Sequence, residues 1–340
     1  MAIRRPLAAA GAAILLLGLA GTAFLAWQRG QAQAAVVTPT LGSAAGCASH
    51  SGVPEGFGRD LRAGMTRVPG GAFEPGTMRG YPDERPNGRV AIRPFWIDRT
   101  EVTNAQFAAF VEATGYRTWA EREGGAAVFR APPRGVSTQN PMPWWVFVEG
   151  ASWRHPEGPD SNLNDRDNHP VVHVAREDAL AYARWLGRDL PTEDEWEWAA
   201  RASGQPERLD REPRDAEGKP VANFWQGVFP YVDSAEDQHA GRAPVGCYAT
   251  NGWGLHDMIG NVWEWTLDPY RGVRQPHGNG DPAAELKAAG ITLPPGSSYV
   301  IKGGSYLCAA SYCSRFRSTA RHPMEDNLPT SHVGFRTVLR

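Results

Sequence analysis

The sequence predicts an irregular α+β domain built from short strands, many turns and few helices. Among its 340 residues are 38 glycines and 28 prolines, which favour turns and leave little uninterrupted helix. Hydrophobic residues make up 41% and aromatic residues 10%, including 13 tryptophans, so the chain can fill a sizeable core. Short runs with strand-like alternation are mixed with helical patterns, and this mixture indicates the α+β class.

Three helices are expected in the folded part of the chain. The first is capped by Asn104 and ends at Gly115. The second covers residues 176–186, where small and aromatic apolar residues recur at helical spacing. The third begins after Thr192, because Thr192 and Glu195 have the spacing of a capping box.

Strands are expected where short apolar runs alternate with polar residues or lie between turn signals. They fall at residues 65–73, 90–103, 243–248, 298–302 and 333–339. The chain has no repeat of fixed period. The glycine-containing run GWGLHDMIG lacks the preceding strand and the glycine spacing of a dinucleotide-binding loop, so no nucleotide site is predicted.

The N-terminal 34 residues carry a membrane-targeting pattern. An arginine pair at residues 4–5 precedes an uncharged run over residues 7–27, which as a helix measures about 30 Å, the thickness of a bilayer core. Positive charge on the short side predicts that this end stays in the cytoplasm and that the rest is exported. We favour a signal anchor for residues 1–34, and the small-residue run at residues 32–34 leaves a cleaved signal peptide as the alternative.

The rest of the chain divides into a linker and one domain. Residues 35–63 are rich in Ala, Gly, Ser and Thr and are expected to be a linker, and residues 64–340 form the domain. The protein is therefore expected to be periplasmic or otherwise extracytoplasmic, either anchored by a single membrane pass or secreted. The formal net charge of −2 and the absence of long Lys/Arg clusters exclude nucleic acid as a main partner.

The four cysteines form two groups. Cys308 and Cys313 lie five residues apart in the run GGSYLCAASYCSRFR, and such a pair indicates a disulfide, a redox pair or a soft-metal site. In an exported protein a structural disulfide is the first interpretation from spacing alone. Cys47 and Cys247 are either free or paired with each other.

Several runs together resemble the formylglycine-generating enzyme family. They are PFWIDRTEVTNAQFAAFVEATGY, ASWRHPEGPDSN, LPTEDEWEWAAR, NGWGLHDMIGNVWEWT, KGGSYLCAASYC and GFR, in that order over residues 65–340. The pieces WRHPEGP and the cysteine pair are similar to the oxidase branch of the family. The resemblance implies a mixed α+β fold of irregular topology, related to C-type lectin-like domains and low in regular secondary structure.

The resemblance also implies an activity and a site. Family members use one copper ion and O2 to oxidise the cysteine of a Cys-x-Pro-x-Arg motif in unfolded sulfatase polypeptides to Cα-formylglycine. Cys308 and Cys313 match the copper ligands. Cu(I) is a soft ion that prefers thiolates, so two cysteines suffice to hold it and leave room for the substrate sulfur. Ser305 matches a serine on the oxygen side of the pocket, and Trp263 matches a residue that packs beside it.

Structural calcium is a further implication of the resemblance, because Ca2+ prefers oxygen ligands. The first implied site uses the side chains of Asn223 and Asp237 and the carbonyls of Phe224 and His239. The second implied site uses the side chains of Asp257 and Glu264 and the carbonyls of Gly260 and Val262. The alternative is that these acids are solvated loop residues. Positions of disulfides in secretory-pathway relatives hold residues such as Ser318 and Thr337 here, so packing rather than cross-links is expected to stabilise the domain.

Other polar and aromatic residues receive structural interpretations. The histidines His155, His169 and His173 are expected to serve turn and strand packing rather than a metal site. Acidic residues of the helix after Thr192 are expected to be solvated or ion-paired. The Trp144-Trp145 pair fits either the floor of a peptide groove or the core.

Two other functions remain open from the sequence. A non-catalytic binding or regulatory module of the same fold is the first alternative, and it predicts that one or both cysteines of the pair are lost. An iron-dependent sulfur oxidase of the ergothioneine-synthesis kind is the second, and it requires an additional helical domain that does not fit before residue 65.

Overall fold

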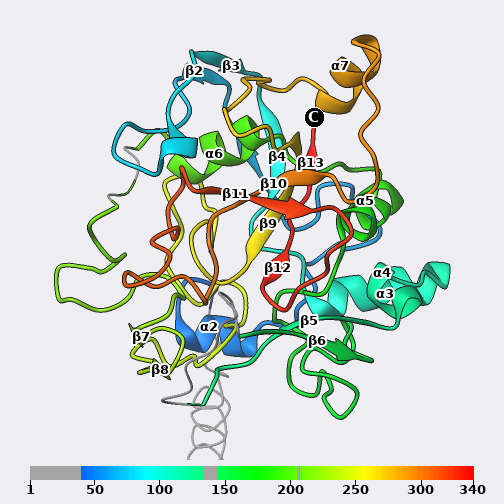
Figure 1. The fold of residues 1–340 in the computed structure, drawn as a ribbon, viewed down its shortest axis with the longest axis vertical. Coiled ribbons are helices and arrows are strands. Elements are labelled where there is room, and N and C mark those ends of the chain that lie inside the picture. The colour runs from blue at the N-terminus through cyan, green and yellow to red at the C-terminus, as the bar shows by residue number, and fades with distance from the viewer. Residues whose placement is uncertain (1–39, 134–143, 205–206, 208) are drawn as a thin grey trace, which may run out of the picture. The chain divides into compact units, whose positions relative to one another are not determined.

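A four-stranded sheet with the strand order β11-β10-β9-β12 lies at the centre of the fold (Figure 1). β10 pairs antiparallel with β9 and β11, and β12 pairs parallel with β9. A second sheet has the order β1-β4-β13, and three two-stranded ribbons complete the strand pairs. The computed structural model describes residues 40–133, 144–204, 207 and 209–340.

The regular elements are short, as an irregular α+β fold requires. The helices are α2 (Ala44–Ser49), α3 (Asn104–Thr114), α4 (Trp119–Glu123), α5 (Arg176–Trp185), α6 (Glu193–Arg201) and α7 (Pro282–Ala288), with a 3-10 turn at Pro82–Glu84. The strands are β1 (Met65–Val68), β2 (Gly71–Phe73), β3 (Val90–Ile92), β4 (Phe95–Asp98), β5 (Gly125–Phe129), β6 (Trp145–Glu149), β7 (Gly227–Val228), β8 (Val232–Asp233), β9 (Trp263–Pro269), β10 (Ser298–Lys302), β11 (Arg321–Glu325), β12 (Val333–Gly334) and β13 (Val338–Leu339). The predicted fold class is confirmed.

The three predicted helices are present. The cap of α3 is Thr103, one residue before the predicted cap, and its hydroxyl forms a capping box with Gln106; the helix ends at Gly115 with φ of 67°. α6 has the predicted capping box of Thr192 and Glu195. α5 follows the predicted range within one residue.

The strand predictions are partly confirmed. β10 lies at residues 298–302 as expected, whereas residues 333–339 form two short strands, β12 and β13, that belong to different sheets. Residues 243–248 form no strand and run as a loop. β9 was not predicted because six of its seven residues are buried, so the alternation typical of a half-buried strand is absent.

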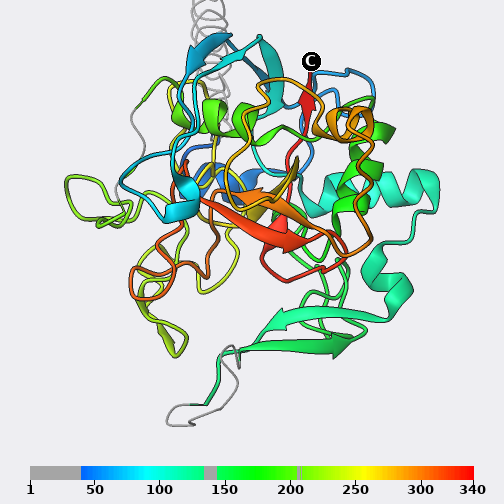
Figure 2. The same cartoon turned by 45° about the horizontal axis from the view of Figure 1, so that its top comes forward.

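Two apolar clusters form the core. The larger one surrounds Phe107, Tyr182 and Phe335, whose rings lie 5.3 to 6.4 Å apart, and it reaches Cys308. The second one packs the β1-β4-β13 sheet against Trp196 and neighbouring residues of α6. The β5-β6 hairpin extends away from the central sheet (Figure 2).

The acidic face of α6 is ion-paired but not solvated. Glu193, Asp194, Glu195 and Glu197 are each 1% exposed or less, which contradicts the solvated interpretation. Their partners come from elsewhere in the fold and are Arg201, Arg274, Lys302, Arg321 and Arg340. A buried carboxylate needs such partners because desolvation of an unpaired charge is costly.

Residues 40–63 fold onto the domain rather than forming a linker. α2 carries Cys47, which forms a disulfide with Cys247 at a sequence separation of 200. Asn168 donates a hydrogen bond of 2.7 Å to the Cys47 carbonyl, and Arg188 donates to the carbonyls of Leu61 and Ala63. The expected linker and the expectation of a domain without cross-links are therefore corrected. Composition alone predicted a linker because small residues are typical of linkers. The same small residues also allow close packing against a distant part of the chain.

The predicted membrane segment, residues 1–34, lies outside the described residues. Within the part of the chain that is described, none of the helices combines the length and the apolarity needed to cross a bilayer.

Candidate active site and cation sites

Cys308 and Cys313 are free thiols whose Sγ atoms lie 3.4 Å apart. Cys308 is 2% exposed and belongs to the core, and Cys313 is partly exposed. Both lie on the loop over residues 303–320 that joins β10 to β11. Because Lys302 pairs with Arg321 in the sheet, the two ends of this loop are held side by side.

Local backbone geometry brings the two cysteines together. Gly304 has φ of +82°, and a Cβ at this position would lie 2.4 Å from the carbonyl oxygen of Arg315. Only glycine therefore allows this close approach of the two sides of the loop. The Cys308 amide donates to the Ser305 carbonyl at 2.9 Å, and the Cys313 amide donates to the Ala309 carbonyl at 2.8 Å.

The two thiols differ electrostatically. Burial raises the pKa of Cys308 well above its usual value, and the contact with Cys313 adds to the rise. The hydrogen bond from Cys308 lowers the pKa of Cys313, and the nearby charges of Arg315 and Arg317 lower it further. Cys313 is therefore the more readily ionised sulfur of the two.

The other predicted catalytic residues lie around this pair. Ser305 is fully buried, and its carbonyl holds the Cys308 amide. Trp263 is 3% exposed at the start of β9, belongs to the same core cluster as Cys308, and stacks on His322 at 5.8 Å. Ser305 is thus in hydrogen-bond contact with Cys308, whereas Trp263 shares only the core cluster with it, and the roles of both stay predictions.

Four aromatic side chains form a wall beside Cys313, namely Tyr312, Phe229, Trp144 and Trp145. Tyr312 is 48% exposed and stacks on Phe229 with ring centroids 4.4 Å apart. Trp144 meets both rings edge-on at 5.3 Å, and Trp145 packs against Phe129 and His332. The Trp144-Trp145 pair thus joins the wall next to the thiols.

Glu157 of the WRHPEGP run lines a charged pocket that also includes Tyr306 of the cysteine loop. Glu157 pairs with Arg166 and Arg242, each at 2.9 Å. These residues line a pocket of about 350 Å³ together with Trp225, whose amide donates to the Cys308 carbonyl at 2.9 Å. The pocket connects the discriminating motif of the sequence to the cysteine loop.

The three histidines contact the backbone or an amide, as packing residues do. His155 Nδ1 lies 2.6 Å from the Ser161 carbonyl oxygen, and His173 Nε2 lies 2.7 Å from the Pro156 carbonyl oxygen. His169 contacts the side chain of Asn168. In the described ranges, no group of three or more His, Cys, Asp or Glu side chains is arranged so that it could hold a metal ion.

The first implied calcium site brings oxygen atoms together around Gln226. Its side-chain amide donates to the Phe224 carbonyl and to Asp237 Oδ2, so these two oxygens share one donor. Asn223 is 1% exposed, and its Oδ1 atom has no hydrogen-bond partner in the part of the chain that the structure describes. The amide of His239 donates to Asp237 Oδ1. The Asn223 amide oxygen is therefore a donor of the kind that a hard cation prefers, whereas both Asp237 oxygens already accept hydrogen bonds.

The second implied site differs from its predicted composition. Both Glu264 oxygens accept hydrogen bonds of 2.7 Å from Arg336, and one also accepts from Trp196. Among the described residues, neither Asp257 Oδ1 nor Oε2 of Glu101, a residue that was not predicted, has a hydrogen-bond partner, and both atoms are buried. Burial and the Asp257 charge raise the pKa of Glu101 well above its usual value, and burial raises the pKa of Asp257 to about 6.

Three buried carboxylates therefore face one guanidinium at the second site. In the described residues these three acids do not form a three-ligand metal group. The oxygens that a hard cation could bind are Glu101 Oε2 and Asp257 Oδ1, since Glu264 is already paired with Arg336. The signal for Glu101 in the sequence is the run DRTEVTN, in which an acid precedes a helix cap.

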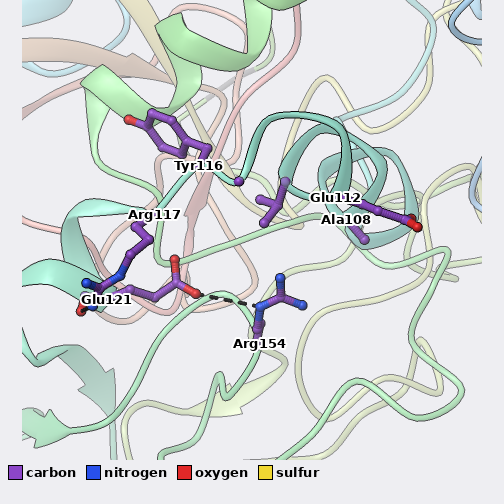
Figure 3. A pocket seen from close by; sticks show the side chains of 8 residues that line it. Ala108, Glu112, Tyr116, Arg117, Glu121 and Arg154 are labelled. Atoms are coloured by element: carbon purple, nitrogen blue, oxygen red, sulfur yellow. Dashed lines mark hydrogen bonds and ion pairs between the residues drawn. The ribbon is translucent and has the colours of Figure 1, made fainter.

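A separate pocket lies along α3 and α4 (Figure 3). It measures about 560 Å³, is lined by residues such as Tyr116 and Glu112, and contains the ion pair of Arg154 with Glu121 at 3.6 Å. No cysteine lines it, so it does not belong to the thiol site.

Comparisons with known proteins agree with this geometry. Residues 50–340 match the Sulfatase-modifying factor enzyme 1-like domain. The chain is 44% identical to the formylglycine-generating enzyme of Mycobacterium tuberculosis over 293 residues, covering 81% of this chain and 97% of the relative. It is also 40% identical to the bovine protein named inactive C-alpha-formylglycine-generating enzyme 2, over 82% of this chain and 89% of the relative. The structure of PvdO from Pseudomonas aeruginosa has a TM-score of 0.54 at 24% identity, covering 81% of this chain and 94% of that one, and it supports the fold.

The chain therefore belongs to the formylglycine-generating enzyme (sulfatase-modifying factor) family. Within this family it is an enzyme of the formylglycine-generating class, a conclusion that rests on its identity to curated formylglycine-generating enzymes.

Proposed function

We propose that this protein is a copper-dependent oxidase that converts the cysteine of a Cys-x-Pro-x-Arg motif in unfolded sulfatase polypeptides to Cα-formylglycine with O2. The observation that carries the proposal is the pair of free thiols, Cys308 and Cys313, with Sγ atoms 3.4 Å apart. The names of the similar enzymes support formylglycine formation as the reaction.

The thiol pair fits Cu(I) by its donor chemistry. Two convergent soft sulfurs with no third acidic, histidine or cysteine ligand in the described residues suit a soft ion of low coordination number. When bound, copper supplies the redox chemistry with O2 that side chains alone lack. Cys308 and Cys313 hold it as thiolates, and the lowered pKa of Cys313 favours release of its proton.

The exposed members of the loop are Ala310, Ser311 and Tyr312, directly before the partly exposed Cys313, and this supports an approach of the substrate cysteine from their side, along the rings of Trp144 and Phe229. Ser305 and Trp263 are buried, which suits contact with a small oxygen molecule rather than with a peptide. Converting the substrate thiol to an aldehyde, with release of its sulfur as hydrogen sulfide, takes two electrons from the substrate. Reduction of O2 to water takes four, so a thiol reductant supplies the other two.

The test incubates the full-length protein with Cu(I), O2, a thiol reductant and a Cys-x-Pro-x-Arg peptide. The expected product has an aldehyde in place of the thiol, detected by its mass and by capture with a hydrazide. Cys308→Ser and Cys313→Ser should each abolish conversion. The double variant Cys47→Ser/Cys247→Ser is the matched control and should retain it, because those sulfurs form the distant disulfide. A copper-loaded wild type that leaves the peptide thiol unchanged would refute the proposal.

A non-catalytic binding or regulatory role is the second candidate, and the 40% identity to a relative named inactive favours testing it. It predicts peptide binding without any change of mass. Retention of both cysteines argues against it.

We also propose that the domain binds Ca2+ at two sites, one formed by Asn223, Phe224, Asp237 and His239, and one formed by Asp257, Gly260, Val262 and Glu264 with Glu101. The unpartnered oxygens of Asn223, Asp257 and Glu101 support this. Removal of Ca2+ with a chelator should lower the midpoint of thermal unfolding, and added Ca2+ but not Mg2+ should restore it, since Mg2+ demands a stricter octahedral site. Asn223→Ala and Asp257→Asn should each reduce the calcium response, and an equal response in these variants would contradict the assignment.

Export is a further proposal, with residues 1–34 acting as a signal anchor or signal peptide. The Cys47–Cys247 disulfide supports it, because structural disulfides persist in oxidising compartments. Fractionation of cells with an antibody to the domain separates a membrane-bound or secreted protein from a cytoplasmic one, and recovery in the cytoplasmic fraction alone would refute export.

A further inference from the structure

A buried ion pair lies next to the cysteine loop. Arg317 donates two hydrogen bonds of 2.6 Å to the two carboxylate oxygens of Glu84, and both side chains are fully buried. Thr319 adds a third hydrogen bond to Glu84 at 3.0 Å. The pair joins the loop to the 3-10 turn at Pro82–Glu84, which lies more than two hundred residues away in the sequence.

Arg317 and Tyr81 hold the backbone immediately after Cys313. Arg317 Nε donates to the Ser314 carbonyl at 2.7 Å. The Ser314 amide donates to the hydroxyl of Tyr81 at 3.2 Å. Both peptide groups of Ser314 are therefore fixed by groups that belong to, or are anchored on, residues 81–84. Since Ser314 follows Cys313 directly, these contacts restrict where the Cys313 side chain can lie.

A third attachment strengthens this side of the loop. Arg315 pairs with Asp83 at 3.2 Å, and its guanidinium lies 4.3 Å from the centre of the Tyr81 ring. Cys308 is held by other means, namely its amide bond to Ser305 and its carbonyl bond to Trp225. The contacts of residues 81–84 thus act on one cysteine of the pair.

Stability alone gives a poor explanation for a bidentate charge pair in a protein interior. Desolvation offsets most of the attraction, and well-packed apolar residues often stabilise as well or better. A planar guanidinium that binds a carboxylate through two bonds and a carbonyl through a third instead fixes an orientation.

We infer that Tyr81, Glu84 and Arg317 are positioning residues that hold Cys313 Sγ against Cys308 Sγ. The inference rests on the proposed function only in its consequence for copper, since the geometry of the thiol pair exists without the ion. Weakening the contacts of Tyr81, Glu84 and Arg317, which we call the brace, should lower the effective concentration of one thiol for the other. The affinity of the thiol pair for Cu(I) should fall with it.

The test compares Arg317→Lys, Tyr81→Phe and the control Arg188→Lys in the full-length protein. Arg188 is a matched control because it is also buried, pairs with Asp98 at 2.8 Å and donates to backbone carbonyls, and these partners do not belong to the cysteine loop. The first readout, made without metal, is the equilibrium constant for Cys308–Cys313 disulfide formation against glutathione. The second is Cu(I) affinity by competition with a chromophoric chelator.

Arg317→Lys should lower the disulfide equilibrium constant about tenfold, and Tyr81→Phe about threefold, as for the loss of one or two hydrogen bonds that fix the loop. Arg188→Lys should leave it within about twofold while lowering the unfolding temperature as much as Arg317→Lys does. If neither Arg317→Lys nor Tyr81→Phe changes the disulfide equilibrium constant, the inference is overturned. It is also overturned if Arg188→Lys lowers this constant as much as they do. Tyr81→Phe decides the matter alone if Arg317→Lys does not fold.

The two readouts separate this inference from the proposed function. A shifted disulfide equilibrium supports the brace even if wild-type protein fails to bind Cu(I), an outcome that would refute the copper proposal alone. If wild type binds Cu(I), Arg317→Lys should bind it about tenfold more weakly, in proportion to the disulfide equilibrium.

Discussion

The two thiols of the pair differ in pKa because their surroundings differ. Cys308 lies in the core and its pKa is raised by burial, whereas Cys313, five residues on, is partly exposed and its pKa is lowered by the contact with Cys308 and by two nearby arginines. One cysteine of the pair therefore keeps its proton more firmly, and the other ionises more easily. An oxidising compartment would close the pair into a disulfide, so in the proposed function the protein must receive Cu(I) first or be reduced afterwards.

His332 should make the protein sensitive to acid. It is 8% exposed, its Nδ1 lies 2.8 Å from the Thr330 hydroxyl, and burial lowers its pKa to about 3. The folded protein therefore binds fewer protons than the unfolded chain below about pH 6.5. This stabilising contribution is complete above that pH and is lost as the pH falls toward 3, by up to about 1.4 kcal/mol per pH unit.

His332→Asn keeps an amide that can bond to Thr330 and removes the titration. The free energy of unfolding of this variant, measured in urea at several pH values, should fall less steeply below about pH 6.5 than that of wild type. Parallel pH dependences of the two proteins would show that His332 titrates normally in the folded state.

At the scale of elements, local sequence patterns predicted where helices begin. They did not predict the buried strand β9 or the buried ion pairs of α6. Thr192 and Glu195 fix the start of α6 by a local pattern, so this boundary is correct. β9 and the partners of the α6 carboxylates depend on contacts over many tens of residues, such as Glu193 with Arg321, which no local pattern records. For the same reason the cysteine pair was found by its spacing, but Glu101 and the Tyr81–Glu84 contacts required the fold.

Lys302 links α6 to the central sheet and is expected to be essential for stability. It is fully buried at the end of β10, with Nζ 3.1 Å from Glu197 Oε2 and 3.5 Å from Glu193 Oε1. Lys302→Met removes the cation and leaves the carboxylates with less compensation, which should cost about 3–5 kcal/mol.

The control is Arg122→Met, which breaks the exposed pair of Arg122 with Glu177 and should cost under about 1 kcal/mol. Urea unfolding of both variants gives the comparison. Equal small losses would mean that Arg274, which also contacts Glu197, compensates fully for the missing lysine.

At the scale of the whole molecule, one covalent link ties the start of the domain to its distant loops. The sequence predicted a linker at residues 35–63, since nothing local distinguishes Cys47 from a free thiol. In the fold, Cys47, Ala243 and Cys247 form a small buried cluster of their own next to the loop that carries Tyr248. The N-terminal part of the domain is thereby fastened close to Asp257 and the second implied calcium site, because Gly246 donates to Asp257 Oδ2 at 2.6 Å.

Breaking this disulfide should weaken the fold without disturbing the thiol pair. A cross-link that closes a loop of 200 residues limits the unfolded chain strongly, and the chain-entropy relation gives about 5 kcal/mol as an upper value. Cys47→Ser/Cys247→Ser should therefore lower the free energy of unfolding by a few kcal/mol, measured in urea. Wild type should lose the same amount in a strong reductant, whereas the double variant should not respond to it.

Because Cys308 and Cys313 are free, the variant should still show two titratable thiols when unfolded and keep its Cu(I) affinity. If reductant leaves wild-type stability unchanged, the link between Cys47 and Cys247 does not restrain the unfolded chain, and packing of residues 40–63 alone holds them to the domain.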